Sequence, residues 1–131
     1  MADPISVTQT VCDYLTAGLP GTLKAYGRVP SPRPKKFVRV RVTGGGGGSL
    51  VTINPTVTVE AYASAESDAE QLAETCDYLM RQADIVGWLG DVPCRSVEAF
   101  ARPGVLPDPL TPDQGRFTAL YSLVLKSPLT L

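Results

Sequence analysis

Two strand-like runs joined by a glycine-rich segment, residues 37–63, constrain the fold of this chain more than any other feature. In the first run Val38, Val40 and Val42 alternate with aromatic or charged residues, and the second run alternates aliphatic residues with threonine. A period of two with β-branched side chains is typical of strands buried on one face. The five glycines at 44–48 look like an engineered linker, but the alternation continues on both sides. We therefore interpret them as the loop of a long native β-hairpin.

The segment after the hairpin predicts an amphipathic helix over residues 65–83. Ser64 is placed to cap its first turn, which also carries acidic residues where the helix dipole favours them. Small and apolar side chains form one stripe at helical spacing. The stripe consists of Ala65, Ala69, Leu72, Ala73, Cys76, Leu79, Met80 and Ala83. We expect this stripe to cover the valine face of the hairpin and to form the core.

Shorter patterns complete the chain. Asp3 and Pro4 are a typical start for a first helix, which Gly18 would end. Residues 23–29 predict a short strand, and the prolines that follow make residues 30–36 an exposed basic loop. Residues 94–102 predict a further strand with Val97, Ala99 and Ala101 on one side, followed by a second proline-rich loop.

The last strand-like run, residues 116–126, is apolar on both faces. One face carries Phe117, Ala119, Tyr121, Leu123 and Leu125. Leu120 and Val124 add apolar area to the other face. Because a strand of this kind is normally covered on both sides, we expect the first helix or another subunit to cover Leu120 and Val124.

The order of these elements predicts an α+β fold in a single domain of residues 1–131. The sheet is expected to be mainly antiparallel, with four to five strands that include the long β-hairpin. One of the two helices is expected to pack on the sheet face. A length of 131 residues suits one hydrophobic core of ordinary size.

The composition excludes several kinds of catalytic site. The chain contains no histidine, so Ser–His and Cys–His pairs and histidine-ligated metals are impossible. The glycine run does not match a phosphate-binding loop, because no Gly-Lys-Ser/Thr follows and the run leads into a strand. Cys12, Cys76 and Cys94 lack metal-ligand spacing and are expected to be buried thiols in a reducing compartment. We therefore expect no enzyme, no cofactor and no metal.

Charge and hydropathy limit the possible partners. The net charge is −1, from 12 basic and 13 acidic residues, which argues against a partner bound mainly by charge. The N-terminus lacks the pattern of a signal peptide, and no run is long and apolar enough to span a bilayer. We expect no membrane partner and synthesis in a cytoplasm.

Candidate contact residues come from the loops, the hairpin and the last strand. Arg39 and Arg41 on the outer side of a strand, with Lys35 and Lys36 just before them, form a basic patch, which is either solvated or faces an acidic partner or a polyanion. Asp108 and Asp113 are expected to be turn residues of the second proline-rich loop. The candidate interface comprises Arg39, Arg41, Gly44, Gly46, Gly48, Asp108, Asp113, Arg116, Leu120 and Val124.

In residues 38–45, 54–63 with the helix that follows, 106–109 and 114–121, the sequence resembles the tail terminator proteins of long-tailed (siphovirus-type) bacteriophages, especially those that infect actinobacteria. With the N-terminal helix, the resemblance covers most of the chain. It is a resemblance of pattern and includes no catalytic signature. The five-glycine loop and the proline-rich residues 30–34 depart from the family.

The resemblance implies an α+β subunit of a homohexameric ring at the head-proximal end of the tail tube. In that family the ring stops polymerisation of the major tail tube protein and docks the tail to the head-completion, or neck, protein. Its lumen lets genomic DNA pass without sequence-specific binding. The expected location is the neck region of the virion, after assembly in the cytoplasm of the bacterial host.

Two alternatives stay open at this point. The chain could be another neck or tail-tube component of the same fold. It could also be a small nucleic-acid-binding α+β module that uses Arg39 and Arg41 on an open sheet.

Overall fold

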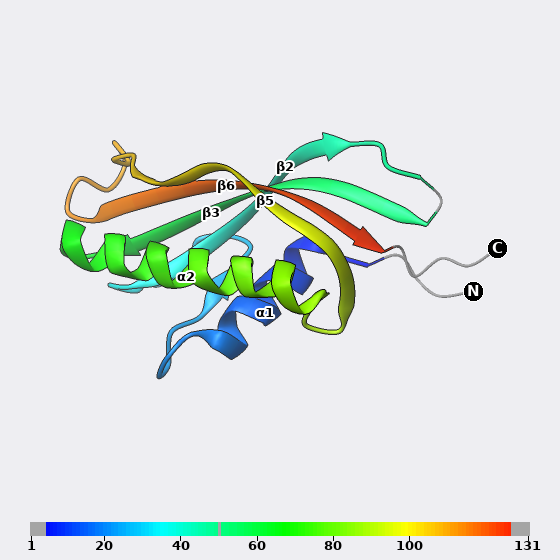
Figure 1. The fold of residues 1–131 in the computed structure, drawn as a ribbon. Helices are drawn as coiled ribbons and strands as arrows, with labels where there is room; N and C mark the ends of the chain where they lie inside the picture. Colours follow the sequence, from blue (N-terminus) through cyan, green and yellow to red (C-terminus); the bar gives the residue numbers. More distant parts are fainter. Residues whose placement is uncertain (1–4, 50, 127–131) are drawn as a thin grey trace.

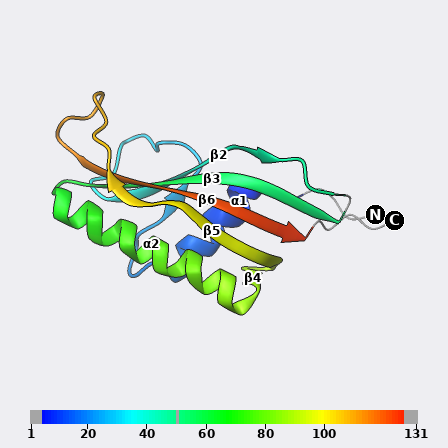
Figure 2. The same cartoon turned by 45° about the horizontal axis from the view of Figure 1, so that its top comes forward.

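Two helices lie on one face of a curled six-stranded sheet (Figures 1 and 2). The structure is a computed structural model that describes residues 5–49 and 51–126. In chain order the elements are helix α1 (Val7–Gly18), strands β1 (Ala25–Tyr26), β2 (Phe37–Gly46) and β3 (Thr52–Ala63), helix α2 (Glu66–Val86), and strands β4 (Trp88–Leu89), β5 (Val92–Val105) and β6 (Gly115–Lys126). Neither helix is long and apolar enough to cross a membrane.

The strand order across the sheet is β1-β2-β3-β6-β5-β4. β1 runs parallel to β2, and all other neighbours are antiparallel. The α+β class and the long antiparallel strands are confirmed, but the sheet is mixed and has six strands, where four to five were expected. The additional strand is β4, which was not predicted. The sheet is mixed because β1, to which only Ala25 and Tyr26 of residues 23–29 contribute, runs parallel to β2. Gly87 has a left-handed backbone (φ 86°) that ends α2 and turns the chain into β4.

The hairpin has the expected valine face but a shorter loop than predicted. Three of the five glycines belong to β2, which continues to Gly46. The register shifts between Val42 and Gly45, which marks a bulge in β2 next to the point where Asn54 and Pro55 of β3 pair with Gly46 and Gly45. Gly45 has φ 127°, and a side chain there would collide with the carbonyl oxygen of Asn54. β3 itself is a central strand between β2 and β6, so Asn54 and Pro55 do not lie at a sheet edge.

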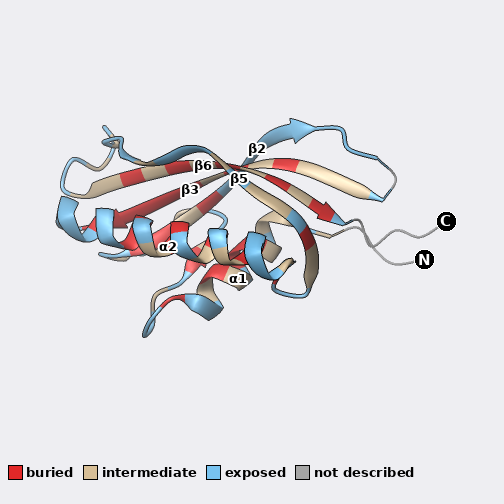
Figure 3. Cartoon of the chain, in the orientation of Figure 1, coloured by how far each residue is buried: buried red, intermediate tan, exposed pale blue. Residues whose placement is uncertain are grey.

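The core lies between the sheet and both helices (Figure 3). The packing of the valine face under α2 was predicted, whereas the position of α1 on the same face was not. Val38, Val40 and Val59 of the hairpin are buried beneath the α2 stripe and the inner face of α1. All five residues assigned to the inner face of residues 116–126 are buried. In α2 the buried residues are Ala69, Leu72, Ala73, Cys76, Asp77, Met80 and Ala83. Asp77 was not expected among them.

Both helices begin later than the sequence patterns predicted. The N-cap of α1 is Ser6, whose Oγ accepts a hydrogen bond from the N–H of Gln9 (3.2 Å). Asp3 and Pro4 lie outside the described residues. Ala65, which is exposed, is the N-cap of α2 and makes no side-chain capping bond, so Ser64 is not the cap. The acidic first turn of α2 supplies dipole compensation without that cap.

β5 is less regular than its sequence pattern suggests. Its pairing with β6 shifts register three times, between Cys94 and Ser96, between Ala99 and Ala101, and between Ala101 and Gly104. Each shift adds a bulge that bends the strand and increases its twist. As a result Ala101 is exposed and does not share a face with Val97 and Ala99, which are half-buried.

The sheet face away from the helices, here called the outer face, carries no helix. α1 packs on the same side as α2, so the expectation that α1 covers Leu120 and Val124 is wrong. Both residues are half-buried on the outer side of β6. Since the helices leave this face open, contacts with other molecules can be made there and at the two sheet edges.

Candidate functional site

A buried carboxylate, Glu60, lies at the centre of a charged cluster on the outer face. In the sheet register Arg39, Glu60 and Thr118 are direct cross-strand neighbours on β2, β3 and β6. Glu60 is 2% exposed. Its Oε2 lies 3.0 Å from Arg116 Nη1 and 3.7 Å from Arg41 Nη1, and its Oε1 lies 4.0 Å from Arg39 Nη1. Three arginines therefore share one carboxylate.

Burial separates the three ion pairs into one strong and two weaker contacts. The Arg116 side chain is 15% exposed and hydrogen-bonds to Glu60, whereas the Arg41 side chain is 48% exposed. A charged hydrogen bond at a buried site contributes more than an exposed pair, which water screens. Glu60 Oε1, Arg39 Nε and Thr118 Oγ1 are buried atoms without a hydrogen-bond partner among the described residues.

The two arginines of the predicted basic patch are not free, whereas Lys35 and Lys36 are exposed and form no ion pair with the described residues. Arg39 and Arg41 both face Glu60, which balances part of their charge. A nucleic-acid surface needs cations that can reach phosphates. The arrangement gives no support to a module that binds nucleic acid mainly through these two arginines.

An aromatic pair continues the cluster toward the chain's proline-rich loops. The rings of Phe37 and Tyr62 stack with centroids 4.7 Å apart and an interplanar angle of 7°. The Arg33 guanidinium lies over both rings, 4.8 Å from the Tyr62 centroid and 5.3 Å from the Phe37 centroid. In cation–π contacts of this kind the electron-rich ring faces attract the guanidinium and hold the arginine in place.

Arg33 and Gln114 fasten the two proline-rich loops to each other. Arg33 Nε donates to Gln114 Oε1 (2.6 Å), and Gln114 Nε2 donates to the carbonyl oxygen of Pro34 (3.0 Å). Arg116 Nε donates to the carbonyl oxygen of Leu106 (2.6 Å), which holds the second loop against β6. The loops thus close one end of the outer face over the charged cluster.

Asp108 is a turn residue, as predicted, and it also joins the cluster. Its Oδ1 accepts the N–H of Leu110 (3.0 Å), and this bond, helped by nearby Arg116 and Arg33, holds the pKa of Asp108 below its usual range. Its Oδ2 lies 3.9 Å from Arg33 Nη2. A carboxylate kept ionised in this way is a structural anion and a poor proton donor.

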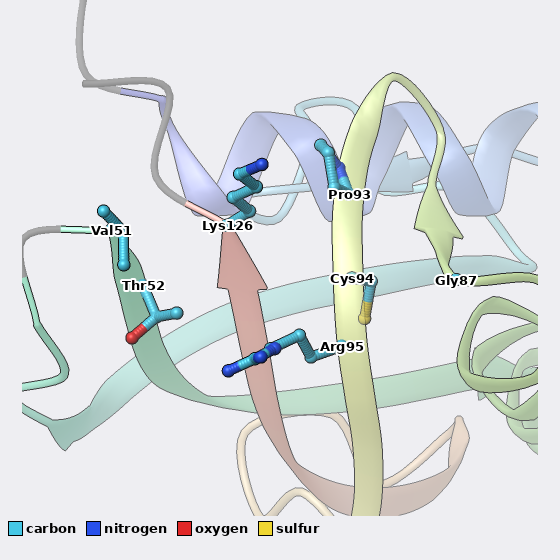
Figure 4. Close-up of a pocket in the computed structure, with 7 residues that line it drawn as sticks. All are labelled: Val51, Thr52, Gly87, Pro93, Cys94, Arg95 and Lys126. Atoms are coloured by element: carbon cyan, nitrogen blue, oxygen red, sulfur yellow. The ribbon is translucent and has the colours of Figure 1, made fainter. Parts of the chain in front are cut away.

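A hollow of about 310 Å³ opens at the opposite end of the sheet (Figure 4). It is lined by Val51, Thr52, Gly87, Pro93, Cys94, Arg95 and Lys126. The only thiol in this lining is Cys94, whose pKa burial raises to about 11. A protonated thiol is a weak nucleophile, and the lining contains no carboxylate to activate it. The hollow therefore does not favour covalent catalysis.

All three cysteines are buried free thiols, which confirms the predicted burial. Burial raises the pKa of Cys12 to about 11 and that of Cys76 to about 12. Each pKa lies well above neutral pH, so the thiols stay protonated and act as small apolar core residues.

Asp77 supplies a second buried polar contact, between α2 and β6. Its Oδ1 accepts the hydroxyl of Tyr121 (2.7 Å), and its Oδ2 accepts Arg81 Nε (2.8 Å). Burial and the Asp77 carboxylate together raise the pKa of Tyr121. Both carboxylate oxygens are thus used inside the fold, which indicates a structural role.

The predicted contact residues fall into three groups. Arg39, Arg41, Arg116 and Asp108 come together in the charged cluster. Gly44, Gly46 and Gly48 lie far from it at the hairpin tip, where Gly48 has φ 68°. Leu120 and Val124 lie along β6, and Asp113 is exposed in the second proline-rich loop.

Sequence reasoning missed Glu60 and Arg33. Aligning the two valine runs of the hairpin would have placed Glu60 directly opposite Arg39, so the signal was present in the strand register. Arg33 had no such signal, because the path of its loop depends on distant Gln114 and Tyr62.

The sheet leaves both of its long edges partly open among the described residues. β1 pairs with β2 only at Val38 and Arg39, so residues 40–46 of β2 have no strand beside them on that side. β4 pairs with β5 only at Val92 and Pro93. The next edge amides of β5 are used within the fold, since Cys94 donates to the Gly87 carbonyl and Val97 donates to Asp84. Residues 98–105 then have no further strand partner on that side.

Comparison of the chain with family models and with curated proteins gave no match.

Proposed function

We propose that this chain is a structural, non-enzymatic subunit of a bacteriophage virion, with the fold of a tail terminator protein. Six copies would form a ring on the head-proximal end of the tail tube. The ring would end polymerisation of the major tail tube protein and present the surface to which the head-completion protein binds. Genomic DNA would pass through its lumen without sequence-specific contacts.

One observation carries the proposal beyond the sequence resemblance: the sheet has two different, partly open long edges. Soluble proteins usually protect such edges, because unpaired main-chain groups recruit other strands. Two unlike edges on one molecule fit a head-to-tail contact, and head-to-tail contacts close into rings when the rotation between copies allows it. Specific interfaces of this kind bury on the order of 1,200 to 2,000 Å².

The loops and the hairpin tip give such a ring two distinct ends. The proline-rich loops, fastened by Arg33 and Gln114, lie at one end of the strands, and the glycine-rich tip of the hairpin lies at the other (Figure 1). A ring built from the sheet edges would therefore display all loop clusters on one side and all hairpin tips on the other. Tube protein and neck protein would each have one side to bind.

Native mass measurement together with negative-stain imaging tests the ring. The expected species has six times the chain mass of 13.9 kDa and a central hole. In a second step, the purified protein is added to polymerising tube protein from the same phage. We expect a ring at one tube end and shorter tubes than in its absence.

Three results would contradict the proposal in different ways. A strict monomer that does not bind tube ends would refute it. Rings that become incorporated along the tube without stopping growth would assign the chain to the tube itself. Salt-sensitive binding to DNA by a monomer would favour the nucleic-acid-binding alternative.

A further inference from the structure

The two open edges of the sheet run in directions that allow one copy to extend the sheet of another. β2 and β6 run one way, and β3 and β5 run the opposite way, because each neighbouring pair is antiparallel. A second copy placed beside the first in the same orientation brings its β2 antiparallel to β5. Antiparallel pairing is the more favourable arrangement for adjacent strands.

The open stretches also lie at the same level along the strands. Arg41 lies opposite Thr58, Thr58 opposite Leu120, and Leu120 opposite Ala101, in one line across the sheet. A copy moved sideways along this line places its Arg41 beside Ala101. Because the two strands run antiparallel, residues 40–44 of one copy then lie along residues 102–98 of the next, and both of these stretches are open.

An exposed apolar side chain is present on each open stretch at this level. Val42 on β2 is 40% exposed, and Phe100, at a bulge of β5, is 60% exposed. Across the sheet Val42 pairs with Val57, Val57 with Tyr121, and Tyr121 with Ala99, so Val42 lies at the level of Ala99. Phe100 follows Ala99 in the chain. Edge pairing would remove both side chains from water, and aromatic side chains are frequent anchors of interfaces.

The charges on the two sides of the sheet are complementary. Residues 24–41, on the β1 and β2 side, contain seven basic residues and no acidic one. Residues 66–91, which form α2 and β4 on the β5 side, contain seven acidic residues and one basic residue. Some of these charges are paired internally, but Lys24, Lys35 and Lys36 form no ion pair with the described residues. Opposite charge on opposite sides favours head-to-tail over head-to-head contact.

We propose that the partner of each open edge is a second copy of this chain: residues 40–44 of β2 in one copy pair antiparallel with residues 98–102 of β5 in the next, with Arg41 beside Ala101. The inference rests on the proposed ring for its closure, and it specifies the surfaces that the ring would use.

Cysteine cross-linking of the full chain tests the pairing. Arg41→Cys and Ala101→Cys are combined in one chain and treated with a short bismaleimide; both positions are exposed, whereas the native thiols are buried. A head-to-tail contact predicts a covalent ladder up to six subunits in the double variant and none in either single variant. The control variant Ala17→Cys with Ala101→Cys replaces one partner by an exposed α1 position and should give no ladder.

The outcomes separate this inference from the proposed function. Rings that give no ladder would overturn the edge pairing and leave the ring intact. A ladder from protein that does not cap tubes would keep the pairing and refute the tail function. Dimers from a single variant would show a two-fold contact, and a strict monomer would overturn both proposals.

Phe100→Asp provides a second test that requires no cross-link. It should weaken association about tenfold or more, as expected for an interface anchor. Leu110→Asp is the matched control, because Leu110 is 87% exposed but lies in the loop away from the open edges. Unchanged circular dichroism would verify that both variants fold. Equal association of the two variants would contradict the proposal.

Discussion

Replacing Glu60 by glutamine should destabilise the chain more than the corresponding amide substitution of any other acidic residue on the sheet. Glu60 is 2% exposed and faces three arginines. Glutamine keeps the shape but removes the negative charge, leaving Arg116 and Arg39 without their counterion. Breaking a buried charged contact is costly because the remaining charge stays desolvated.

The magnitude follows from how each arginine is exposed. The Arg116 hydrogen bond at 3.0 Å is charged and largely buried, and such bonds contribute about 1.5–3 kcal/mol. The Arg41 and Arg39 pairs are longer and more exposed, so each contributes about 1 kcal/mol or less. We expect Glu60→Gln to lower the free energy of unfolding by about 2–4 kcal/mol.

Urea unfolding measures this loss, with Glu70→Gln as the matched control. Glu70 is exposed on α2, so its substitution should change the free energy of unfolding by less than about 0.5 kcal/mol. With a denaturant slope of about 1–3 kcal/mol/M, the Glu60→Gln midpoint should fall by about 1 M or more. In double-mutant cycles, Glu60 should couple more strongly to Arg116 than to Arg41. Equal costs for Glu60→Gln and Glu70→Gln would refute the reasoning, as would stronger coupling to Arg41.

Three further predictions concern the hairpin, the core and the thiols. Gly45→Ala should lower the free energy of unfolding by about 2 kcal/mol or more, because the φ of 127° and the Asn54 carbonyl both exclude a side chain. The control Gly47→Ala, whose new side chain would lie in open space, should change the free energy of unfolding by less than about 0.5 kcal/mol. Equal urea midpoints for the two variants would contradict this prediction. Tyr121→Phe leaves buried Asp77 without one donor and should cost about 1–3 kcal/mol in the same assay, while exposed Tyr78→Phe should be neutral. The native thiols should resist alkylation at pH 8 and react after unfolding in urea, and rapid labelling of the folded chain would contradict this prediction. Because the fold raises the pKa values of the thiols above 9, their contribution to stability is present below pH 9 and is lost as the pH rises toward 11.

The parts of the fold that could be predicted are those with a repeating pattern. The valine alternation and the α2 stripe each extend over many residues, so the hairpin, its partner helix and the inner face of β6 were found. Two-residue strands such as β4 (Trp88–Leu89) have no period to detect. The bulges of β5 also escaped, because its pattern looks regular until pairing with β6 reveals the shifts.

Only part of the candidate site could be predicted, because several of its contacts join segments that are far apart in the sequence. Arg39, Arg41 and Arg116 were identified from their positions on strands, but their common partner Glu60 was not. Outward alternation describes which face a residue is on, and does not say whether that face is covered. Here Arg33 and the two proline-rich loops cover it, through contacts between segments about 80 residues apart in sequence.

The closure of the charged cluster also bears on which surfaces are free for association. The apolar residues Leu120 and Val124 on β6 were predicted as contact residues. Both are already half-buried, and the neighbouring end of the outer face is closed by the chain's own loops. The sheet edges differ from that face, because main-chain groups along residues 40–46 and 98–105 can be satisfied only by water or by another strand. Exposed Val42 and Phe100 lie on the same two stretches. If copies of the chain associate, the edges therefore offer both hydrogen bonds and apolar burial, whereas the outer face of β6 offers only a modest apolar addition.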